Sequence, residues 1–374
     1  MLLIENDADL NKIAAEVQKE PAIGVDLEAD SMFHYQEKVC LLQISTHALN
    51  IVIDPLSVQD LSPLAPVFAD ARIRKVFHGA DYDIRSLYRD FGIEVHSLFD
   101  TQIAARFLGV RETGLASLLK MRFDVLSDKK YQKKDWSQRP LPAAMLKYAV
   151  QDICYLLPLA GILERELMEK GLLFCVEEEC ELLSGVRPNS SRKRPFFLSF
   201  RGAARLDPRS LAVLEKILCF RDQVARRRDY PHFKVLGNRP IIDIVRIKPL
   251  TKTDLTEIKG LSPKLIDRFG RSLIEKVKEG LSLPDEALPL YPKKPRRRLI
   301  SKEAARVKAL KSWRERLGKK WEVDPALVCT NAQIRAIAIA NPGEPENMQC
   351  IEGIRKWQIK LFGPDICNVL QKTG

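Results

Sequence analysis

Two acidic side chains near the start of this 374-residue chain have the residue type and the spacing of metal ligands. Asp26 and Glu28 lie two residues apart in the otherwise apolar run AIGVDLEA, which is typical of a buried strand. Such residues point to the same face of a strand, and like charges that close resist ionisation unless a cation lies between them. The pattern therefore indicates a site for Mg²⁺ or Mn²⁺, although an edge strand with a solvated acidic face is an alternative.

Two later stretches supply partners for such a site. KVFHGADYDI reads as a strand that runs into a helix, with Asp81 and Asp83 at the junction. In KYAVQD, Tyr148 and Asp152 are four residues apart and share one face of a helix, where a phenol beside a carboxylate can orient a water molecule. Taken singly, Asp81 fits a helix N-cap and Tyr148 fits an amphipathic surface position.

The elements that must position these residues form an α/β domain. Runs rich in Val and Ile alternate with helical periodicity over the first part of the chain, which predicts a mixed sheet with helices. The expected strands are 22–29, 39–46, 49–55 and 74–80, and the expected helices are 61–70, 81–92, 98–109, 114–123 and 141–167.

The second half of the chain repeats one small helical unit. Stretches rich in Pro and basic residues at 184–197 and 283–303 read as linkers. When CFRDQ at 219–223 is placed over SWRER at 312–316, further identical residues align at the same offset of 93. A constant offset is typical of tandem copies, and scattered chance matches are the alternative. The expected domains are an α/β domain over 1–185 and two small all-α domains over 205–282 and 300–372.

The charge is divided unevenly along the chain. Residues 1–180 carry 20 Lys and Arg against 28 Asp and Glu, a net charge of −8, whereas residues 181–374 carry 41 against 21, a net charge of +20. A basic half can hold a polyanion while an acidic half holds metal, although a charge that serves only solubility is the alternative.

Several classes of protein are disfavoured. No run approaches the roughly 18 uninterrupted apolar residues of a membrane span. GVRETGLA at 109–116 lacks the Lys and the Ser or Thr of a phosphate-binding loop, and the eight Cys include no CxxC pair. We therefore expect a cytoplasmic protein that has no membrane contact and uses no nucleotide cofactor.

The acidic stretches, in this order, resemble the three motifs of the DEDD-type 3′→5′ exonucleases. VDLEAD resembles the first motif, FHGADYDI the second with Asp83, and YAVQD the third. Lys147 stands five residues before Asp152, where the histidine branch of the family has His, so the chain resembles the tyrosine branch. DWSQRPL at 135–141 and the two helical copies, which resemble the small domains shared by RecQ helicases and ribonuclease D, extend the resemblance to the ribonuclease D family over nearly the whole chain.

The resemblance implies an α/β ribonuclease-H-like exonuclease domain with a mixed sheet, followed by two small all-α HRDC-like domains. It implies a monomeric 3′→5′ exoribonuclease that releases nucleoside 5′-monophosphates from RNA, for example from the 3′ trailers of tRNA precursors. Phosphodiester hydrolysis benefits from two metal ions because the attacking and the leaving oxygens both carry charge in the transition state. The residues implied are Asp26, Glu28, Asp83 and Asp152 as ligands of two divalent ions, Mg²⁺ or Mn²⁺, and Tyr148 as the residue that positions water.

Other residues are candidates for contact with the substrate. KKYQKKDW at 129–136 interleaves basic and aromatic side chains and can touch an RNA backbone, with a solvated loop as the alternative. His78 is either a ligand or, as we favour, a structural residue at a strand end. KKPRRR at 293–298 is either a polyanion-binding linker or a hinge. The candidate substrate-binding residues are Lys133, Lys134, Trp136 and Arg139.

Two rival functions remain on the sequence alone. An exonuclease that acts mainly on DNA would use the same chemistry, because no pocket for the 2′-hydroxyl can be identified. A catalytically inactive nucleic-acid-binding protein would have lost a carboxylate, and all four are present.

Overall fold

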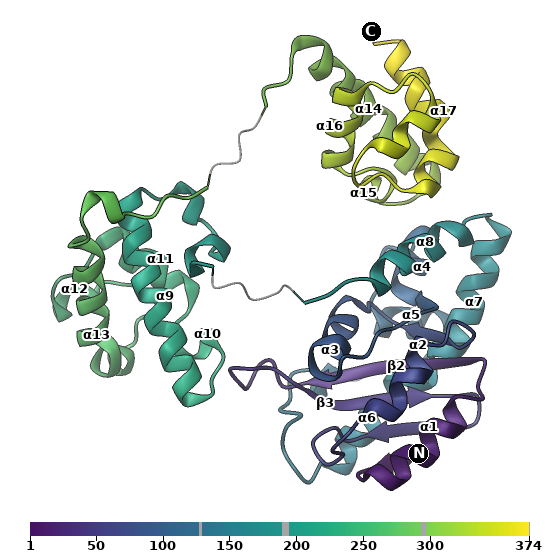
Figure 1. Cartoon of the computed structure of the whole chain (residues 1–374), viewed down its shortest axis with the longest axis horizontal. Coiled ribbons are helices and arrows are strands. Elements are labelled where there is room, and N and C mark those ends of the chain that lie inside the picture. The colour runs from purple at the N-terminus through teal and green to yellow at the C-terminus, as the bar shows by residue number, and fades with distance from the viewer. Residues whose placement is uncertain (127–128, 189–193, 293–296, 374) are drawn as a thin grey trace. The chain divides into compact units, whose positions relative to one another are not determined.

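The computed structural model describes residues 1–126, 129–188, 194–292 and 297–373 (Figure 1). By its internal contacts the chain divides into two compact units. Unit 1 consists of Met1–Ala29, Val39–Pro188 and Arg297–Gly374, and unit 2 consists of Asp30–Lys38 and Asn189–Arg296. Most of the basic stretch 293–298 lies outside the described residues, so both of its interpretations stay open.

A six-stranded mixed sheet lies in the N-terminal part of unit 1 (Figure 1). The strand order is β1-β4-β3-β2-β5-β6. Strand β3 runs antiparallel to its neighbours β2 and β4, and the other adjacent pairs are parallel. The expected mixed sheet is confirmed. Its strands are β1 (Leu2–Ile4), β2 (Ala22–Ala29), β3 (Val39–Ser45), β4 (Asn50–Ile53), β5 (Arg74–Phe77) and β6 (Leu98–Asp100).

Helices pack on this sheet and present the candidate residues. Helix α6 packs across β2, β3 and β4, while α7 packs on β2 and β5. The combined run Ala143–Glu169 is long and apolar enough to cross a membrane by composition, but many of its apolar side chains are buried in the core of unit 1. The helices are α1 (Asp7–Val17), α2 (Ala65–Ala69), α3 (Asp81–Phe91), α4 (Thr101–Phe107), α5 (Leu115–Phe123), α6 (Ala143–Cys154), α7 (Leu156–Glu169) and α8 (Leu173–Ser184).

Two of the expected helices were wrong in detail. The expected helix 98–109 starts as strand β6, and helix α4 begins only after Asp100, whose carboxylate caps it by accepting from the backbone N–H of Gln102 and Ile103. The expected helix 141–167 is interrupted at Tyr155. Pro158 explains the interruption, because its ring excludes the backbone hydrogen bond to the residue four positions earlier.

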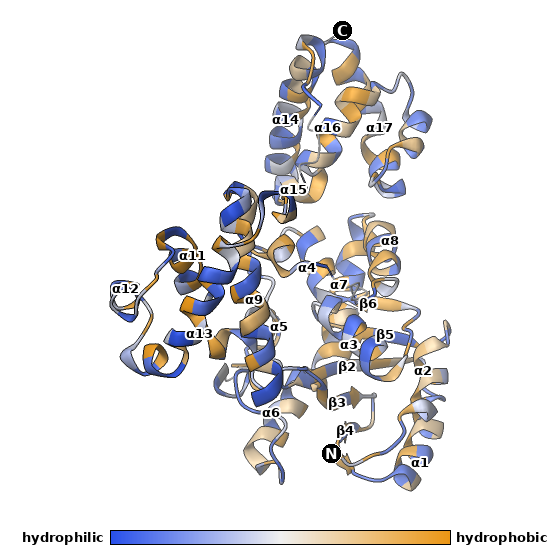
Figure 2. Ribbon diagram, turned by 60° about the vertical axis from the view of Figure 1, so that its left-hand side comes forward, coloured by the Kyte–Doolittle hydropathy of each residue, from blue (hydrophilic) through white to orange (hydrophobic). Residues whose placement is uncertain are grey.

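The tandem repeat is confirmed by the helices beyond the exonuclease domain. Helices α9 and α14 both have 21 residues, and each helix of the first copy begins 93 residues before its counterpart, which for α12 is the 3₁₀ helix Pro345–Cys350. Hydrophilic and hydrophobic residues alternate along these helices (Figure 2), as in amphipathic helices around a small core. The first copy contains α9 (Pro208–Arg228), α10 (His232–Val235), α11 (Asn238–Ile247), α12 (Lys252–Thr256) and α13 (Pro263–Leu281), and the second contains α14 (Ser301–Trp321), α15 (Pro325–Val328), α16 (Asn331–Ala340) and α17 (Lys356–Gln371).

The two copies have different neighbours. The second copy shares the hydrophobic core of unit 1, where the ring of Trp357 meets Phe107 edge-on at 5.2 Å and the Glu178 carboxylate accepts hydrogen bonds from the first backbone N–H groups of α17. The first copy packs in unit 2 with residues 30–38, where the Tyr35 hydroxyl donates to Asp222 at 2.7 Å. The exact domain boundaries remain a prediction.

Candidate active site

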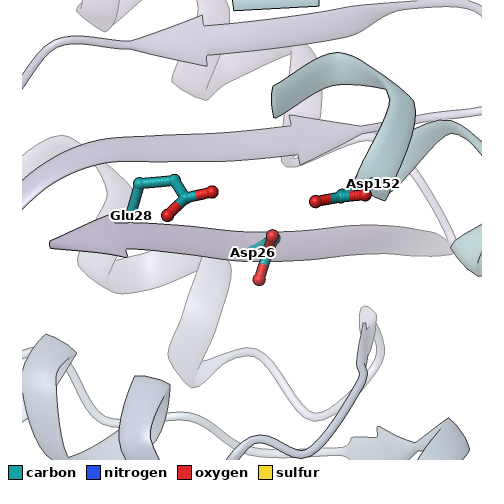
Figure 3. A group of neighbouring side chains, drawn as sticks. All are labelled: Asp26, Glu28 and Asp152. Atoms are coloured by element: carbon teal, nitrogen blue, oxygen red, sulfur yellow. The ribbon is translucent and has the colours of Figure 1, made fainter. Parts of the chain in front are cut away.

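The central strand and one helix bring three of the expected carboxylates together. Asp26 and Glu28 lie on β2, and Asp152 lies on α6, which packs across that strand. One oxygen atom from each of the three carboxylates lies within 4.8 Å of the other two. Figure 3 shows Asp26 and Glu28 along the strand, with Asp152 approaching from the helix.

The close approach of the α6–α7 junction to the sheet depends on two residues that sequence reasoning missed. A Cβ atom on Gly24 would lie 2.4 Å from Ser45 Oγ and 3.0 Å from Leu156 Cβ, so only glycine leaves room there. The Ser45 hydroxyl donates to the backbone oxygen of Ile153 at 3.0 Å, which ties the end of α6 to β3. The neighbouring residue, Asp152, is thereby held over β2. A glycine inside a strand is the signal that could have indicated this close approach.

Asp83 is presented by a turn that another carboxylate fixes. Asp83 is buried in the first turn of α3. The turn before that helix contains Gly79, whose φ of 74° favours glycine. Asp100, itself buried, accepts hydrogen bonds from the backbone N–H groups of Gly79 at 3.0 Å and Ala80 at 2.8 Å. Asp100 therefore connects this turn to the start of α4, a role that the sequence analysis did not anticipate.

Burial and mutual repulsion make these carboxylates hard to ionise. Burial, together with the Asp83 and Asp152 carboxylates, raises the pKa of Asp26 well above its usual range. Burial and the neighbouring Asp26 carboxylate raise the pKa of Glu28 to about 10. Burial, with Asp100 nearby, raises the pKa of Asp83 to about 7. A bound cation would favour the ionised forms, as expected for a metal site.

Tyr148 is buried beside this cluster, on the same helix as Asp152. Burial and the nearby Asp152 carboxylate, to which the hydroxyl is hydrogen-bonded, raise the pKa of the phenol. The ring packs near Trp136, with ring centroids 6.2 Å apart, and near Tyr131 at 5.8 Å. The expected pairing of a phenol and a carboxylate on one helical face is therefore present.

The cluster opens into a cleft of about 540 Å³. Lys133 lines this cleft, which fits its expected contact with substrate. Lys134 is exposed. By contrast, the Trp136 side chain is only 1% exposed, and Arg139 forms a bidentate ion pair with Asp54 at 2.5 and 2.6 Å. These placements give Trp136 and Arg139 structural roles and do not support direct contact with substrate.

The structure also places two residues, Asp81 and His78, for which the sequence left alternatives open. Asp81 does not cap helix α3, and its carboxylate instead pairs with Arg85 at 2.9 Å. His78 lines the cleft, and its Nδ1 lies 2.9 Å from the Thr101 hydroxyl. Burial lowers the pKa of this imidazole, and the structural role that we favour for His78 stays a prediction.

The donor set of the site fits a divalent metal ion. Asp26, Glu28 and Asp152 offer carboxylate oxygens within mutual reach, and hard oxygen ligands of this kind suit Mg²⁺ and Mn²⁺. The high pKa values of the buried carboxylates give a physical reason for a cation to bind.

Comparisons with known proteins agree with this architecture. Residues 1–168 match the family model of a 3′-5′ exonuclease, and residues 210–277 and 303–370 each match the HRDC domain. Ribonuclease D of Acidiphilium cryptum is 30% identical over 373 residues, which cover 97% of this chain and 91% of that protein. This chain belongs to the ribonuclease D family.

Other relatives give the same result. Ribonuclease D of Pseudomonas paraeruginosa is 28% identical, and the match covers 99% of this chain and 97% of that protein. The crystal structure of Escherichia coli RNase D, an exoribonuclease involved in structured RNA processing, matches with a TM-score of 0.73 at 28% identity, covering 99% of this chain and 98% of that one. The expected family, fold and 3′→5′ exoribonuclease function are thereby confirmed.

Proposed function

We propose that the chain removes nucleoside 5′-monophosphates from the 3′ end of RNA, with Asp26, Glu28, Asp83 and Asp152 as ligands of two divalent ions, Mg²⁺ or Mn²⁺. The observation that carries this proposal is the group of three carboxylates within 4.8 Å at a cleft of about 540 Å³. Asp83 is not one of these three, but its charge contributes to the raised pKa of Asp26, which supports its assignment as the fourth ligand.

The chain's own groups have distinct tasks in this proposal. In the ion-free protein Tyr148 keeps its proton, because burial raises the pKa of the phenol, and its hydroxyl orients water and the Asp152 carboxylate. Lys133 neutralises a phosphate of the RNA at the cleft. Bound divalent ions supply charge stabilisation for the attacking and leaving oxygens.

We further propose that the substrates are structured RNAs such as tRNA precursors with 3′ trailers, and that the protein acts as a monomer in the cytoplasm. The similarity to E. coli RNase D, which is involved in structured RNA processing, supports the choice of substrate. The net charge of +20 over residues 181–374 supports a polyanionic partner.

A nuclease assay tests the proposal directly. A tRNA precursor labelled at its 5′ end is incubated with the protein and Mg²⁺ or Mn²⁺, with and without a chelator. We expect products that shorten one nucleotide at a time from the 3′ end, and no products with the chelator. A matched DNA oligonucleotide run in parallel measures the preference for RNA, and faster digestion of DNA would favour the rival DNA exonuclease.

The residue assignment is tested by Asp152→Asn and Asp26→Asn, each of which we expect to abolish nearly all hydrolysis without unfolding the protein. The matched control is Asp81→Asn, because Asp81 lies two residues from Asp83 but pairs with Arg85 at the surface. The control is expected to retain activity. Near wild-type turnover in either cluster variant would refute the assignment.

A further inference from the structure

Gln43 is a buried amide beside the acidic cluster, and the described residues provide no hydrogen-bond partner for it. It lies on β3 directly opposite Asp26 of β2 and opposite Val52 of β4. Its side chain is fully buried, and neither Nε2 nor Oε1 has a partner among the residues that the structure describes. In that part of the chain, Gln43 is the one side chain with two such atoms.

Burial of an unpaired amide is unfavourable, because the group loses its hydrogen bonds to water and gains none. Most buried polar atoms in folded proteins are paired, so a side chain that leaves two atoms unpaired calls for an explanation. Met or Leu would fill a similar volume at this position without burying an unpaired amide. The presence of Gln therefore points to a partner that is engaged in another state of the site.

The surroundings of Gln43 identify that partner. Directly opposite residues of an antiparallel pair have Cβ atoms about 4.5–5.5 Å apart on the same face of the sheet. Gln43 therefore lies beside Asp26, on the face covered by α6. On its other side, Val52 belongs to an apolar cluster with Met145 and Ala149 of that helix. The polar side chain that faces Gln43 across the strand pair is thus a carboxylate of the acidic cluster.

We propose that Gln43 is a positioning residue, whose amide N–H donates a hydrogen bond to Asp26 and orients that carboxylate when the cluster binds a divalent ion. Ligating carboxylates are commonly held by hydrogen bonds from such outer residues, which fix their orientation. This inference rests on the proposed metal site and adds a residue to it.

The test is Gln43→Met in the full-length protein, with Mn²⁺ binding followed by electron paramagnetic resonance and the melting temperature measured in chelator. We expect Mn²⁺ affinity to fall by roughly 10- to 100-fold, the usual effect of losing an outer hydrogen-bond partner. We expect the melting temperature of the ion-free protein to be unchanged or higher, because two unpaired buried atoms are removed.

Gln358→Met is the matched control. Gln358 is also buried, but its amide donates to the Val328 backbone oxygen at 2.7 Å and accepts from the Arg355 backbone N–H at 3.0 Å. Its replacement is expected to lower the melting temperature and to leave Mn²⁺ affinity unchanged.

The outcomes separate this inference from the metal site itself. If the wild-type protein binds no Mn²⁺, the proposed metal site fails and the role of Gln43 fails with it. If the wild type binds Mn²⁺ and Gln43→Met binds it equally well, the metal site stands and the inference is overturned. A loss of affinity accompanied by a fall in melting temperature as large as that of Gln358→Met would indicate damage to the fold and would also overturn it.

Discussion

At the scale of single residues, Tyr148 combines a chemical contact with a packing role. Its hydroxyl is hydrogen-bonded to Asp152, and its ring lies among Trp136 and Tyr131. Replacement by phenylalanine removes the first contact and keeps the second. The two contributions can therefore be measured separately.

We expect Tyr148→Phe to lower kcat by roughly 10²- to 10⁴-fold, the usual contribution of a positioned acid–base group. RNA affinity and melting temperature should change little, because the ring remains in place. Single-turnover rates, RNA binding in chelator and thermal melts measure the three quantities. A phenylalanine variant as fast as the wild type would reduce Tyr148 to a packing residue and remove the basis for the tyrosine branch.

The raised pKa values of the acidic cluster determine how the free energy of unfolding should depend on pH and on bound metal. The pKa values of Asp83 and Glu28 in the folded protein, about 7 and about 10, lie above their ordinary values, so the folded state binds more protons than the unfolded state. The free energy of unfolding must then decrease as pH rises from about 4 through these values. Mg²⁺ opposes the decrease because it favours the ionised carboxylates.

Melting temperatures at pH 5 and pH 9, each with chelator and with Mg²⁺, check this expectation. The ion-free protein should lose more stability between the two pH values than the protein with Mg²⁺. An identical loss under both conditions would mean that these carboxylates do not bind the ion.

At the scale of elements, the contact between β2 and the end of α6 determines where Asp152 lies. We expect Gly24→Ala to lower the free energy of unfolding by about 1–3 kcal/mol, because the added Cβ meets Ser45 Oγ at 2.4 Å in a packed core. We also expect kcat to fall, because the junction of α6 and α7, next to Asp152, must shift away from the sheet. Denaturant unfolding and the exonuclease assay measure both effects.

Two further variants make this prediction specific. Gly161→Ala in helix α7 places a Cβ that meets no described atom within 4 Å beyond its chain neighbours and the backbone of its own helix, so stability should be unchanged or higher by up to about 1 kcal/mol. Gly24→Ala combined with Ser45→Ala should recover part of the lost stability, because Ser45→Ala removes the nearest clashing atom, Ser45 Oγ. A Gly24→Ala protein with wild-type stability and activity would show that the close approach is not required.

Elements with a long local pattern could be predicted from the sequence, whereas short elements and distant contacts could not. The strand carrying Asp26 and the repeated helices follow from periodicity within a single segment. Strand β6 has only three residues, and the sequence pattern predicted it as the first turn of the helix that follows it. The contacts of Gly24 with Ser45 and of Asp100 with Gly79 join residues about twenty positions apart, and no local pattern encodes them. Pro158 is the sequence signal for the break between α6 and α7, although we expected one continuous helix over 141–167.

At the scale of the whole molecule, the net positive charge of the chain resides in unit 2. Unit 1 contains 35 Lys and Arg and 35 Asp and Glu, so its net charge is zero, whereas unit 2 contains 26 and 14, a net charge of +12. The division of the sequence into halves obscured this, because the basic second helical copy shares a unit with the acidic exonuclease domain. Long-range attraction for RNA is therefore expected from unit 2.

Two triple variants test which unit binds RNA. We expect neutralisation in unit 2 to weaken binding to a tRNA precursor and to make its salt dependence shallower, by about 0.7–0.9 in the log–log slope for each phosphate that the protein no longer neutralises. The variants replace three exposed lysines in each unit by glutamine: Lys252, Lys259 and Lys264 in unit 2, and Lys302, Lys308 and Lys311 in helix α14 of unit 1.

The variant in α14 is the control for a change of net charge alone, because it removes the same number of lysines from the same chain. If affinity depends on total charge and not on direct binding of RNA by unit 2, the two variants will show equal affinities and equal slopes. A larger effect from α14 would assign RNA capture to the second copy, next to the exonuclease domain. Binding titrations from low to high salt, carried out in chelator so that no RNA is cleaved, distinguish these results, since each released counterion contributes to the slope.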